Sequence, residues 1–399
     1  MNLSENLENV KSDIRGALYM HALDLEQEGH KVLKLNTGNP AAFGFKMPKS
    51  IKDRIVSDAE KALGYCDIKG MATAREAIKN YHTNRGIKGI GTDDVFIGNG
   101  VSEVAYMIIT ALVGRGDEVL VPTPCYSLWT NFTYLAGGTP KFYVCDENNG
   151  WQPDIESIKN SITPRTKAIV LINPNNPTGA LYTKENLLEI IEIARKNNLV
   201  IISDEIYDRL VLDRKEHIPT ASLCSDVTVV TMNGLSKSHC ICGLRCGWLL
   251  ISGEEKEKKV LRDALVNIAS VRLCSNALMQ LVIPDALSDS EYTQNMISAD
   301  GRIARQREAV IQELEKIDGI SYVKNSAAFY LFPRLDIKKY RLESDRDFAR
   351  KLLDDKKILV IPGSGFSCVD NEHFRIVMLP EENTLRNAIK EIADFLQKR

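Results

Sequence analysis

The sequence lacks any long hydrophobic run, and this absence limits where the protein can act. No apolar stretch approaches the ~20 residues that a helix needs to span a bilayer. Residues 1–16 are polar and of mixed charge, so we expect no secretory signal there. The net charge of −2 at pH 7 gives no electrostatic reason to expect nucleic acid or an anionic membrane as a partner.

Cysteine is present in an odd number, nine, and the residues are scattered along the chain. A disulfide framework usually has an even number of cysteines, whereas free thiols are typical of a reducing compartment. Internal repeats and low-complexity tracts are also missing. With 44% hydrophobic and 26% charged residues, the composition is that of a soluble globular protein. We therefore expect a cytoplasmic protein.

The chain has 399 residues, which is too many for one ordinary hydrophobic core, so two domains are expected. Between about residues 48 and 285, short apolar runs alternate with helical patterns such as 184–196. This alternation predicts an α/β domain with a mostly parallel sheet covered by helices on both faces. The seven predicted strands are 95–97, 118–121, 141–144, 168–172, 200–203, 227–231 and 248–251.

The C-terminal part has a different order of elements, which indicates a smaller α+β domain. The N-terminal segment contains a helix with an apolar face, and we expect this segment to pack with the smaller domain. The elements predicted after the large sheet are helices at 302–317, 345–356 and 383–398 and strands at 329–332, 358–361 and 374–379. The predicted division of the chain is 1–47, 48–290 and 291–399.

One lysine, Lys237, follows the apolar run 227–231 in the stretch Asn-Gly-Leu-Ser-Lys. A lysine just beyond a buried strand is unfavourable unless it pairs with a charge or loses its own charge by forming an imine. Arg245, eight residues later, is suited to binding a phosphate through two parallel hydrogen bonds. A protein that holds pyridoxal phosphate needs such a pair. The alternative is a surface loop with two unrelated basic residues.

Two polar stretches follow predicted strands, where ligands bind in parallel sheets. Residues 173–179, Asn-Pro-Asn-Asn-Pro-Thr-Gly, form a fixed loop from which Asn176 could bond a phenolic oxygen or a carboxylate; an ordinary turn is the alternative. Asp204 could hold a pyridine nitrogen protonated, and Tyr207 could donate to the ring oxygen. The alternative for Asp204 is a helix N-cap.

Two further stretches could bind anions. Residues 98–103, between a strand and the helical run 104–113, place backbone amides and the hydroxyl of Ser102 at a helix start. The alternative is a glycine turn with a serine cap. Arg375 lies inside a predicted strand, where a buried guanidinium needs a carboxylate that a substrate could supply. An internal salt bridge is the alternative.

A possible metal-binding group lies within the lysine–arginine stretch and consists of His239, Cys240, Cys242 and Cys246. Its spacing fits no zinc pattern. We therefore expect no metal here and interpret the cysteines as packing thiols.

In chain order, the loop 173–179, Asp204 with Tyr207, and Lys237 with Arg245 resemble the motifs of class I aminotransferases of fold type I, which depend on pyridoxal 5'-phosphate. The resemblance covers essentially the whole chain. Within this family the sequence looks like the bacterial glutamate–pyruvate aminotransferases. The stretches that carry this finer resemblance are 13–16 (Asp-Ile-Arg-Gly), 35–45 (Leu-Asn-Thr-Gly-Asn-Pro-Ala-Ala-Phe-Gly-Phe), 65–70 (Tyr-Cys-Asp-Ile-Lys-Gly) and 270–276 (Ser-Val-Arg-Leu-Cys-Ser-Asn).

The resemblance implies a role for each motif residue. Lys237 would form the imine with the cofactor and then move a proton, and Asp204 would pair with the pyridine nitrogen. Gly234 stands where many relatives carry a serine, so one phosphate hydroxyl is either missing or replaced by that of Ser236. The other implied contacts are Tyr207 and Asn176 with the ring oxygen, Tyr126 with the ring face, Val101, Ser102 and Arg245 with the phosphate, Tyr65 with the phosphate of the neighbouring subunit, and Gly38, Asn176 and Arg375 with the substrate α-carboxylate.

The implied reaction moves an amino group from L-alanine to 2-oxoglutarate, giving pyruvate and L-glutamate, in a homodimer with shared active sites. His239, Cys240 and Cys242 replace larger or basic residues that we expect between Lys237 and Gly243, and this departure bears on substrate preference. The alternatives are an aminotransferase with aspartate or aromatic preference, a β-lyase acting on cysteine-type substrates, and a non-enzymatic ligand sensor. A sensor of this kind usually carries a DNA-binding extension, which we do not expect here.

Overall fold

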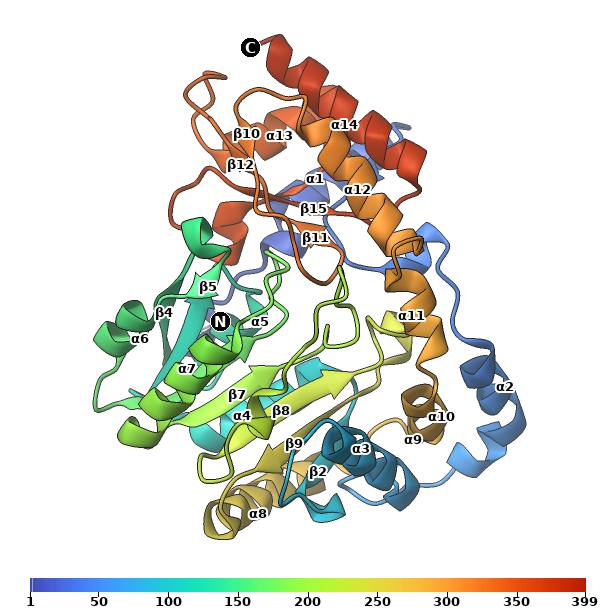
Figure 1. The fold of residues 1–399 in the computed structure, drawn as a ribbon, viewed down its shortest axis with the longest axis vertical. Coiled ribbons are helices and arrows are strands. Elements are labelled where there is room, and N and C mark those ends of the chain that lie inside the picture. The colour runs from blue at the N-terminus through green and yellow to red at the C-terminus, as the bar shows by residue number, and fades with distance from the viewer. Residues whose placement is uncertain (2) are drawn as a thin grey trace.

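The computed structural model describes Met1 and residues 3–399, and in this part of the chain one large sheet has helices on both sides (Figure 1). The sheet has eight strands in the order β2-β9-β8-β7-β6-β3-β4-β5. The five central strands from β8 to β4 are parallel, whereas β9, β2 and β5 each pair in antiparallel fashion. The strands are β2 (Val95–Gly98), β3 (Glu118–Thr123), β4 (Thr139–Asp146), β5 (Gln152–Pro153), β6 (Thr166–Ile172), β7 (Val200–Asp204), β8 (Val229–Gly234) and β9 (Gly247–Ser252).

All seven predicted strands are present in the large sheet, and the mostly parallel α/β arrangement is confirmed. The structure adds β5, a two-residue strand that pairs with the edge strand β4. Two residues are too few to show the alternation of period two that marks a strand in a sequence. The large sheet therefore has one strand more than the seven that the sequence predicted.

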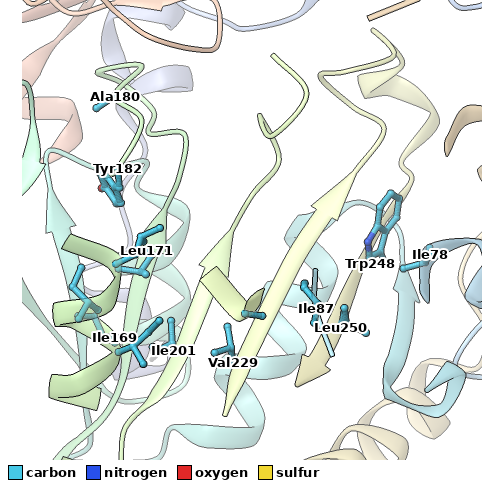
Figure 2. Packing of buried hydrophobic residues seen from close by; sticks show 14 of the residues in the cluster. Ile78, Ile87, Ile169, Leu171, Ala180, Tyr182, Ile201, Val229, Trp248 and Leu250 are labelled. Atoms are coloured by element: carbon cyan, nitrogen blue, oxygen red, sulfur yellow. The ribbon is translucent and has the colours of Figure 1, made fainter. Parts of the chain in front are cut away.

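Both faces of the central strands are buried, and this explains their continuous apolar sequences. In β6, Ile169 and Leu171 belong to the hydrophobic cluster on one face, which Figure 2 shows from close by. The alternate residues Ala168, Val170 and Ile172 belong to the cluster on the opposite face. Because successive side chains of a strand point to opposite sides, every position of β6 from 168 to 172 must be apolar, whereas Lys167 near its start is exposed.

The helices divide between these two faces. Residues of α3, α6 and α7 pack in the first cluster, and residues of α4, α5 and α8 pack in the second. The predicted helix 184–196 is present as α7, while α4 begins three residues earlier than the predicted run 104–113. The helices are α2 (Lys49–Asp58), α3 (Ala72–Asn84), α4 (Val101–Leu112), α5 (Leu128–Leu135), α6 (Ile155–Ser161), α7 (Lys184–Asn197), α8 (Glu255–Arg272), α9 (Ala277–Leu281), α10 (Ile283–Ser288) and α11 (Glu291–Ile297).

The C-terminal residues form a second hydrophobic core with the N-terminal segment, at the top of Figure 1. Leu35 packs in this core, and β1 pairs with β13 in parallel. The expected packing of the N-terminal segment is therefore observed, whereas the domain boundaries after residues 47 and 290 stay a prediction. The elements of this part are α1 (Ala17–Gln27), β1 (Leu33–Lys34), α12 (Arg302–Leu314), β10 (Ile320–Ser321), β11 (Tyr330–Leu331), β12 (Arg334–Leu335), α13 (Asp345–Lys356), β13 (Ile358–Leu359), β14 (Ile361–Pro362), β15 (Phe374–Val377) and α14 (Glu382–Gln397).

Two further properties concern the chain as a whole. Among the helices of the described residues, none combines the length and the apolar character needed to cross a membrane. All nine cysteines, each of which lies within residues 3–399, are free thiols. The expectation of scattered thiols without a disulfide framework is thus met in the structure.

Leu171 offers a test of the double-sided core. Its side chain is fully buried, so Leu171→Ala should lower the free energy of unfolding by about 2–5 kcal/mol, because the cavity that it leaves is lined by rigid neighbours. Leu188 on α7 is 43% exposed, and Leu188→Ala should change stability by no more than about 0.5 kcal/mol. Urea unfolding of both variants measures the difference; equal effects would contradict this description of the core.

Candidate active site

The predicted site residues meet at the carboxyl ends of the parallel strands, around a cavity of about 790 Å³. The loops after β6, β7 and β8 and the start of α4 supply most of the lining, and segments near residues 38 and 375 supply the remainder. The predicted residues that line this cavity are Gly38, Val101, Ser102, Tyr126, Asn176, Asp204, Tyr207, Ser236, Lys237, Arg245 and Arg375. Tyr65 does not line it; its side chain is exposed on the surface of the same chain.

Lys237 points into the cavity and has no carboxylate partner among the described residues. Its amine donates a hydrogen bond to the Gly38 carbonyl oxygen at 2.8 Å and lies 3.7 Å from Cys242 Sγ. Burial favours the neutral amine, but Tyr330 and Cys242 outweigh this effect and hold the pKa of Lys237 above its ordinary value. The alternative of an unrelated surface lysine is therefore wrong.

Asp204 is a buried carboxylate at the end of β7. Its Oδ1 accepts a hydrogen bond from the Ile206 amide at 3.3 Å, and no Lys or Arg side chain of the described residues forms an ion pair with it. Burial raises the pKa of Asp204 to about 6, although Ile206 and Lys237 oppose the shift. The residues that follow form a turn and no helix, so the N-cap alternative is wrong. A cationic group of a ligand in the cavity would supply the ionic partner that Asp204 lacks in the described chain.

Arg245 lies against the N-terminus of α4. A Cβ atom on Gly100 would lie only 2.2 Å from Arg245 Nη2, and one on Gly247 would lie 2.4 Å from the Val101 nitrogen. Glycine at both positions therefore permits the close approach of the guanidinium and the helix start. Ser102 lies within α4, and no side chain caps this helix, so the serine-cap alternative is wrong. Backbone amides at a helix start, a hydroxyl and a guanidinium are the groups that suit an anion.

Gly234, where we expected a serine in many relatives, lies at the end of β8 opposite Gly247. A Cβ atom there would lie 2.6 Å from the Cys246 carbonyl oxygen. This backbone contact leaves no room for a serine side chain. Ser236, two residues later, is the serine of this loop that lines the cavity, whereas the Ser238 hydroxyl lies against His239.

Arg375 is almost completely buried in β15 and has no carboxylate partner among the described residues. It donates a hydrogen bond to Asn176 Oδ1 at 2.8 Å and another to the Asn36 carbonyl. The rings of Tyr330 and Phe366 lie 4.5 and 4.7 Å from its guanidinium carbon. The internal salt bridge that we considered is therefore absent from the described chain, and the buried charge is available to an anion that enters the cavity.

Two polar lining residues, Tyr330 and Arg15, were missed by the sequence analysis as site residues. Tyr330 shares a hydrogen bond with Tyr207, at 2.9 Å between the two hydroxyl oxygens. Its hydroxyl would lie 2.1 Å from a Cβ atom on Gly38, which explains the glycine. Arg15 and Cys242 also line the cavity, and Arg15 forms no ion pair within residues 3–399. No local pattern signalled Tyr330 or a role for Arg15, although Arg15 belongs to the stretch 13–16 and Cys242 to the lysine–arginine stretch noted above.

The possible metal-binding residues near Lys237 do not come together. The ring nitrogens of His239 lie 2.9 Å from the Ser238 hydroxyl and 2.9 Å from the Ala286 carbonyl oxygen. Cys240 lies beside Met296, and Cys246 is buried elsewhere in the core. These contacts are those of packing side chains.

Comparison with known proteins agrees with this geometry. A glutamate-pyruvate aminotransferase from Haemophilus influenzae is 46% identical over 393 residues, which are 98% of this chain and 97% of that protein. An alanine aminotransferase from Mycobacterium tuberculosis is 43% identical over 394 residues, or 98% of this chain and 92% of that protein. These alignments leave almost no part of the chain outside the match.

Solved structures show the same similarity in three dimensions. The crystal structure of an aminotransferase from Escherichia coli has a TM-score of 0.97 and 42% identity, and the match covers 100% of this chain and 98% of that one. The alanine aminotransferase from Pyrococcus furiosus has a TM-score of 0.95 and 36% identity, with full coverage of both chains. The family model of aminotransferases of class I and II matches residues 30–392. The chain belongs to the class I and II aminotransferases and has their fold type I architecture.

Proposed function

We propose that the protein is a pyridoxal 5'-phosphate-dependent aminotransferase that moves the amino group between L-alanine and 2-oxoglutarate. The observation that carries the proposal is a cavity lined by three ionisable groups, Lys237, Asp204 and Arg375, none of which has an ionic partner among the described residues. Relatives named for alanine or for glutamate and pyruvate support the choice of substrates.

The residues present fit the cofactor. The start of α4 with Arg245 suits its phosphate, because the two glycines keep this cradle open. Asp204, a buried carboxylate without a cation, suits its pyridine nitrogen, and Tyr126 suits its ring face. When bound, pyridoxal phosphate supplies an aldehyde that reacts with amines and a ring that withdraws electrons.

Lys237 is the group that we assign to covalent attachment of the cofactor and to proton transfer at the substrate Cα. A free lysine amine in a cavity can act as a general base once it has lost its proton. The Gly38 carbonyl orients this amine in the structure at 2.8 Å. Tyr207 and Asn176 are assigned to the ring oxygen, and the hydrogen bond with Tyr330 fixes the Tyr207 hydroxyl.

Substrate recognition is assigned to two arginines. Arg375, oriented by Asn176, would bind the α-carboxylate that every amino acid and 2-oxo acid carries. Arg15 would bind the distal carboxylate of glutamate and 2-oxoglutarate, because it lines the same cavity and forms no ion pair in the described chain. Alanine has no distal carboxylate and needs the first arginine alone.

We further propose a cytoplasmic homodimer in which Tyr65 contributes to the phosphate site of the neighbouring subunit. Tyr65 and Leu63 are 86% and 85% exposed, and large apolar side chains that are this exposed are typical of an interaction surface. The position of Tyr65 outside its own cavity agrees with a role in a second subunit.

The role of Lys237 is tested by Lys237→Ala. Without the amine, transamination of alanine should fall by at least about 10³-fold, because both attachment and general base catalysis are removed. Borohydride reduction followed by mass spectrometry should find the cofactor attached at position 237 of the native chain and at no position of the variant. Lys256→Ala, on an exposed position of α8, serves as the control. Undiminished turnover in Lys237→Ala would refute the assignment.

The raised pKa of Asp204 predicts a pH-dependent stability change in the cofactor-free protein. Its pKa is about 6 when folded and about 3.9 when unfolded, so its charge reduces stability progressively as the pH rises from 4 to above 6. Asp204→Asn should therefore raise the free energy of unfolding by about 3 kcal/mol at pH 8 and by almost nothing near pH 4. The same variant should bind pyridoxal phosphate more weakly.

Urea unfolding at the two pH values measures this effect, with the exposed Asp355→Asn as the control. An equal gain at pH 4 and pH 8 would mean that the carboxylate charge is not the cause.

Arg15 and Arg375 should differ in their kinetic effects. Arg15→Met should raise the KM for 2-oxoglutarate by roughly 10- to 100-fold, since one charged contact is lost, and should leave the KM for alanine nearly unchanged. Arg375→Met should impair the use of both substrates. Steady-state kinetics with each substrate varied in turn separates the two; equal effects of Arg15→Met on alanine and 2-oxoglutarate would exclude a role in binding the distal carboxylate.

A further inference from the structure

A second group of reactive side chains lies outside the cavity, in the turn that precedes β15. Cys368, Asp370 and His373 are brought together there, and within residues 3–399 they are the one group of at least three such side chains close enough to share a metal ion. Cys368 Sγ lies 3.6 Å from Asp370 Oδ1 and 3.8 Å from His373 Nδ1, and these two atoms lie 2.9 Å apart. The three ligand atoms thus form a small triangle. None of the three residues lines the aminotransferase cavity.

The imidazole of His373 is held in a fixed orientation. Its ring stacks on Phe332 at 4.8 Å between centroids and packs edge-on against Trp151 at 5.3 Å. The Nε2 atom lies 3.3 Å from Glu147 Oε1, in the segment after β4. A carboxylate on one ring nitrogen commonly orients a histidine whose other nitrogen binds a metal. Here Glu147 lies beside Nε2, so that Nδ1 on the other side of the ring faces Cys368 and Asp370.

The charge around the group is negative. Glu147, Asp370 and Glu372 are three carboxylates. Among the residues that the structure describes, the one guanidinium paired with them is that of Arg334, which contacts Glu147 and Glu372. Asp370 therefore has His373 as its ionic partner in the described chain. Positive charge must be supplied at Nδ1 of this ring, by a proton or by a cation in its place.

We propose that Cys368, Asp370 and His373 bind one Zn²⁺ ion, with water as a fourth ligand. A thiolate, an imidazole and a carboxylate are the ligands that zinc takes in proteins. Bond lengths of about 2.0–2.3 Å and tetrahedral angles place neighbouring ligand atoms roughly 3.3–3.6 Å apart. The observed distances of 2.9, 3.6 and 3.8 Å need only small side-chain movements to reach this arrangement. Asp370 is only partly buried, so an ion can enter from solvent.

Uptake of the ion must displace the protons of the ligand atoms, because zinc binds a deprotonated thiolate and an imidazole nitrogen without a proton. Starting from a protonated imidazole and a thiol, the balanced step is Zn²⁺ giving the bound ion and two protons, one from nitrogen and one from sulfur. As for other sites with such ligands, the affinity should rise with pH.

The ion would join two parts of the fold beside the active site. The turn just before Cys368 is bound to the end of β3 and the residues that follow it. The Thr123 hydroxyl donates a hydrogen bond to the Ser367 carbonyl at 2.6 Å, and the Cys125 amide donates one to the Phe366 carbonyl at 2.9 Å. Tyr126, which lines the cavity, is the next residue after this segment. Through Glu147 the site also contacts the segment after β4. Zinc here would have a structural role, and the proposal does not depend on the assigned reaction.

The test uses the holoenzyme, depleted of metal by dialysis against a chelator and then titrated with ZnCl₂. We expect one zinc per chain by elemental analysis, and X-ray absorption at the zinc edge should show one sulfur at about 2.3 Å with nitrogen and oxygen at about 2.0–2.2 Å. Cys368→Ser and Asp370→Asn should weaken binding by at least about 100-fold, and Glu147→Gln by roughly 10- to 100-fold. Cys224→Ser, at a partly buried thiol outside the group, is the control and should bind as the native chain does.

The proposal is overturned if the native protein retains no zinc, if X-ray absorption finds no sulfur neighbour, or if Cys368→Ser and Asp370→Asn bind zinc as tightly as the native chain. In each of these cases the group is a protonated histidine held between two carboxylates. X-ray absorption is measured on the native protein, so it decides the question even if a variant fails to fold. Alanine turnover is not part of this test, which separates its failure from that of the proposed function.

Discussion

The structure depends on the burial of charges whose partners the described chain does not supply. Asp204 and Arg375 are almost fully buried, and neither forms an ion pair within residues 3–399. An isolated buried charge is unfavourable by several kcal/mol, so the rest of the fold must hold these groups in place against that penalty. The double-sided core of the large sheet provides this stability, because both faces of its central strands are closely packed. The cavity is thus complementary to a ligand that carries the opposite charges.

Glycine residues determine where this ligand can approach the backbone. Gly100 and Gly247 let Arg245 reach the start of α4, and Gly38 lets the Tyr330 hydroxyl lie beside the carbonyl that orients Lys237. At each of these positions a single added methyl group would meet a polar atom at 2.1–2.4 Å. The shape of this cavity therefore depends on glycines, which have no side chain, as much as on the side chains that line it.

The sequence alone predicts much of this arrangement, because the signals are local. Strands buried on both faces, such as β6, are continuous apolar runs, and residues that follow such runs lie at the ligand-binding edge of a parallel sheet. Asp204 and Lys237 were identified in this way. Tyr330 and Arg15 were not, because their proximity arises from the packing of the two ends of the chain across the cavity, which no short pattern encodes. The strand β5 is too short to leave a pattern, and the site roles and the subunit contact of Tyr65 stay predictions.

The order of strands in the large sheet has a consequence for synthesis. Within the described residues the edge strand β2 pairs with β9 alone, and β9 follows it roughly 150 residues later in the sequence. At translation rates of about 5–20 residues per second, this interval lasts roughly 8–30 s. During that time the ribosome-bound chain carries an apolar segment, Val95–Gly98, with no neighbouring strand on either side. Such an unpaired edge is prone to aggregation, so the growing polypeptide needs a chaperone or a temporary cover by α4 until its permanent neighbour emerges.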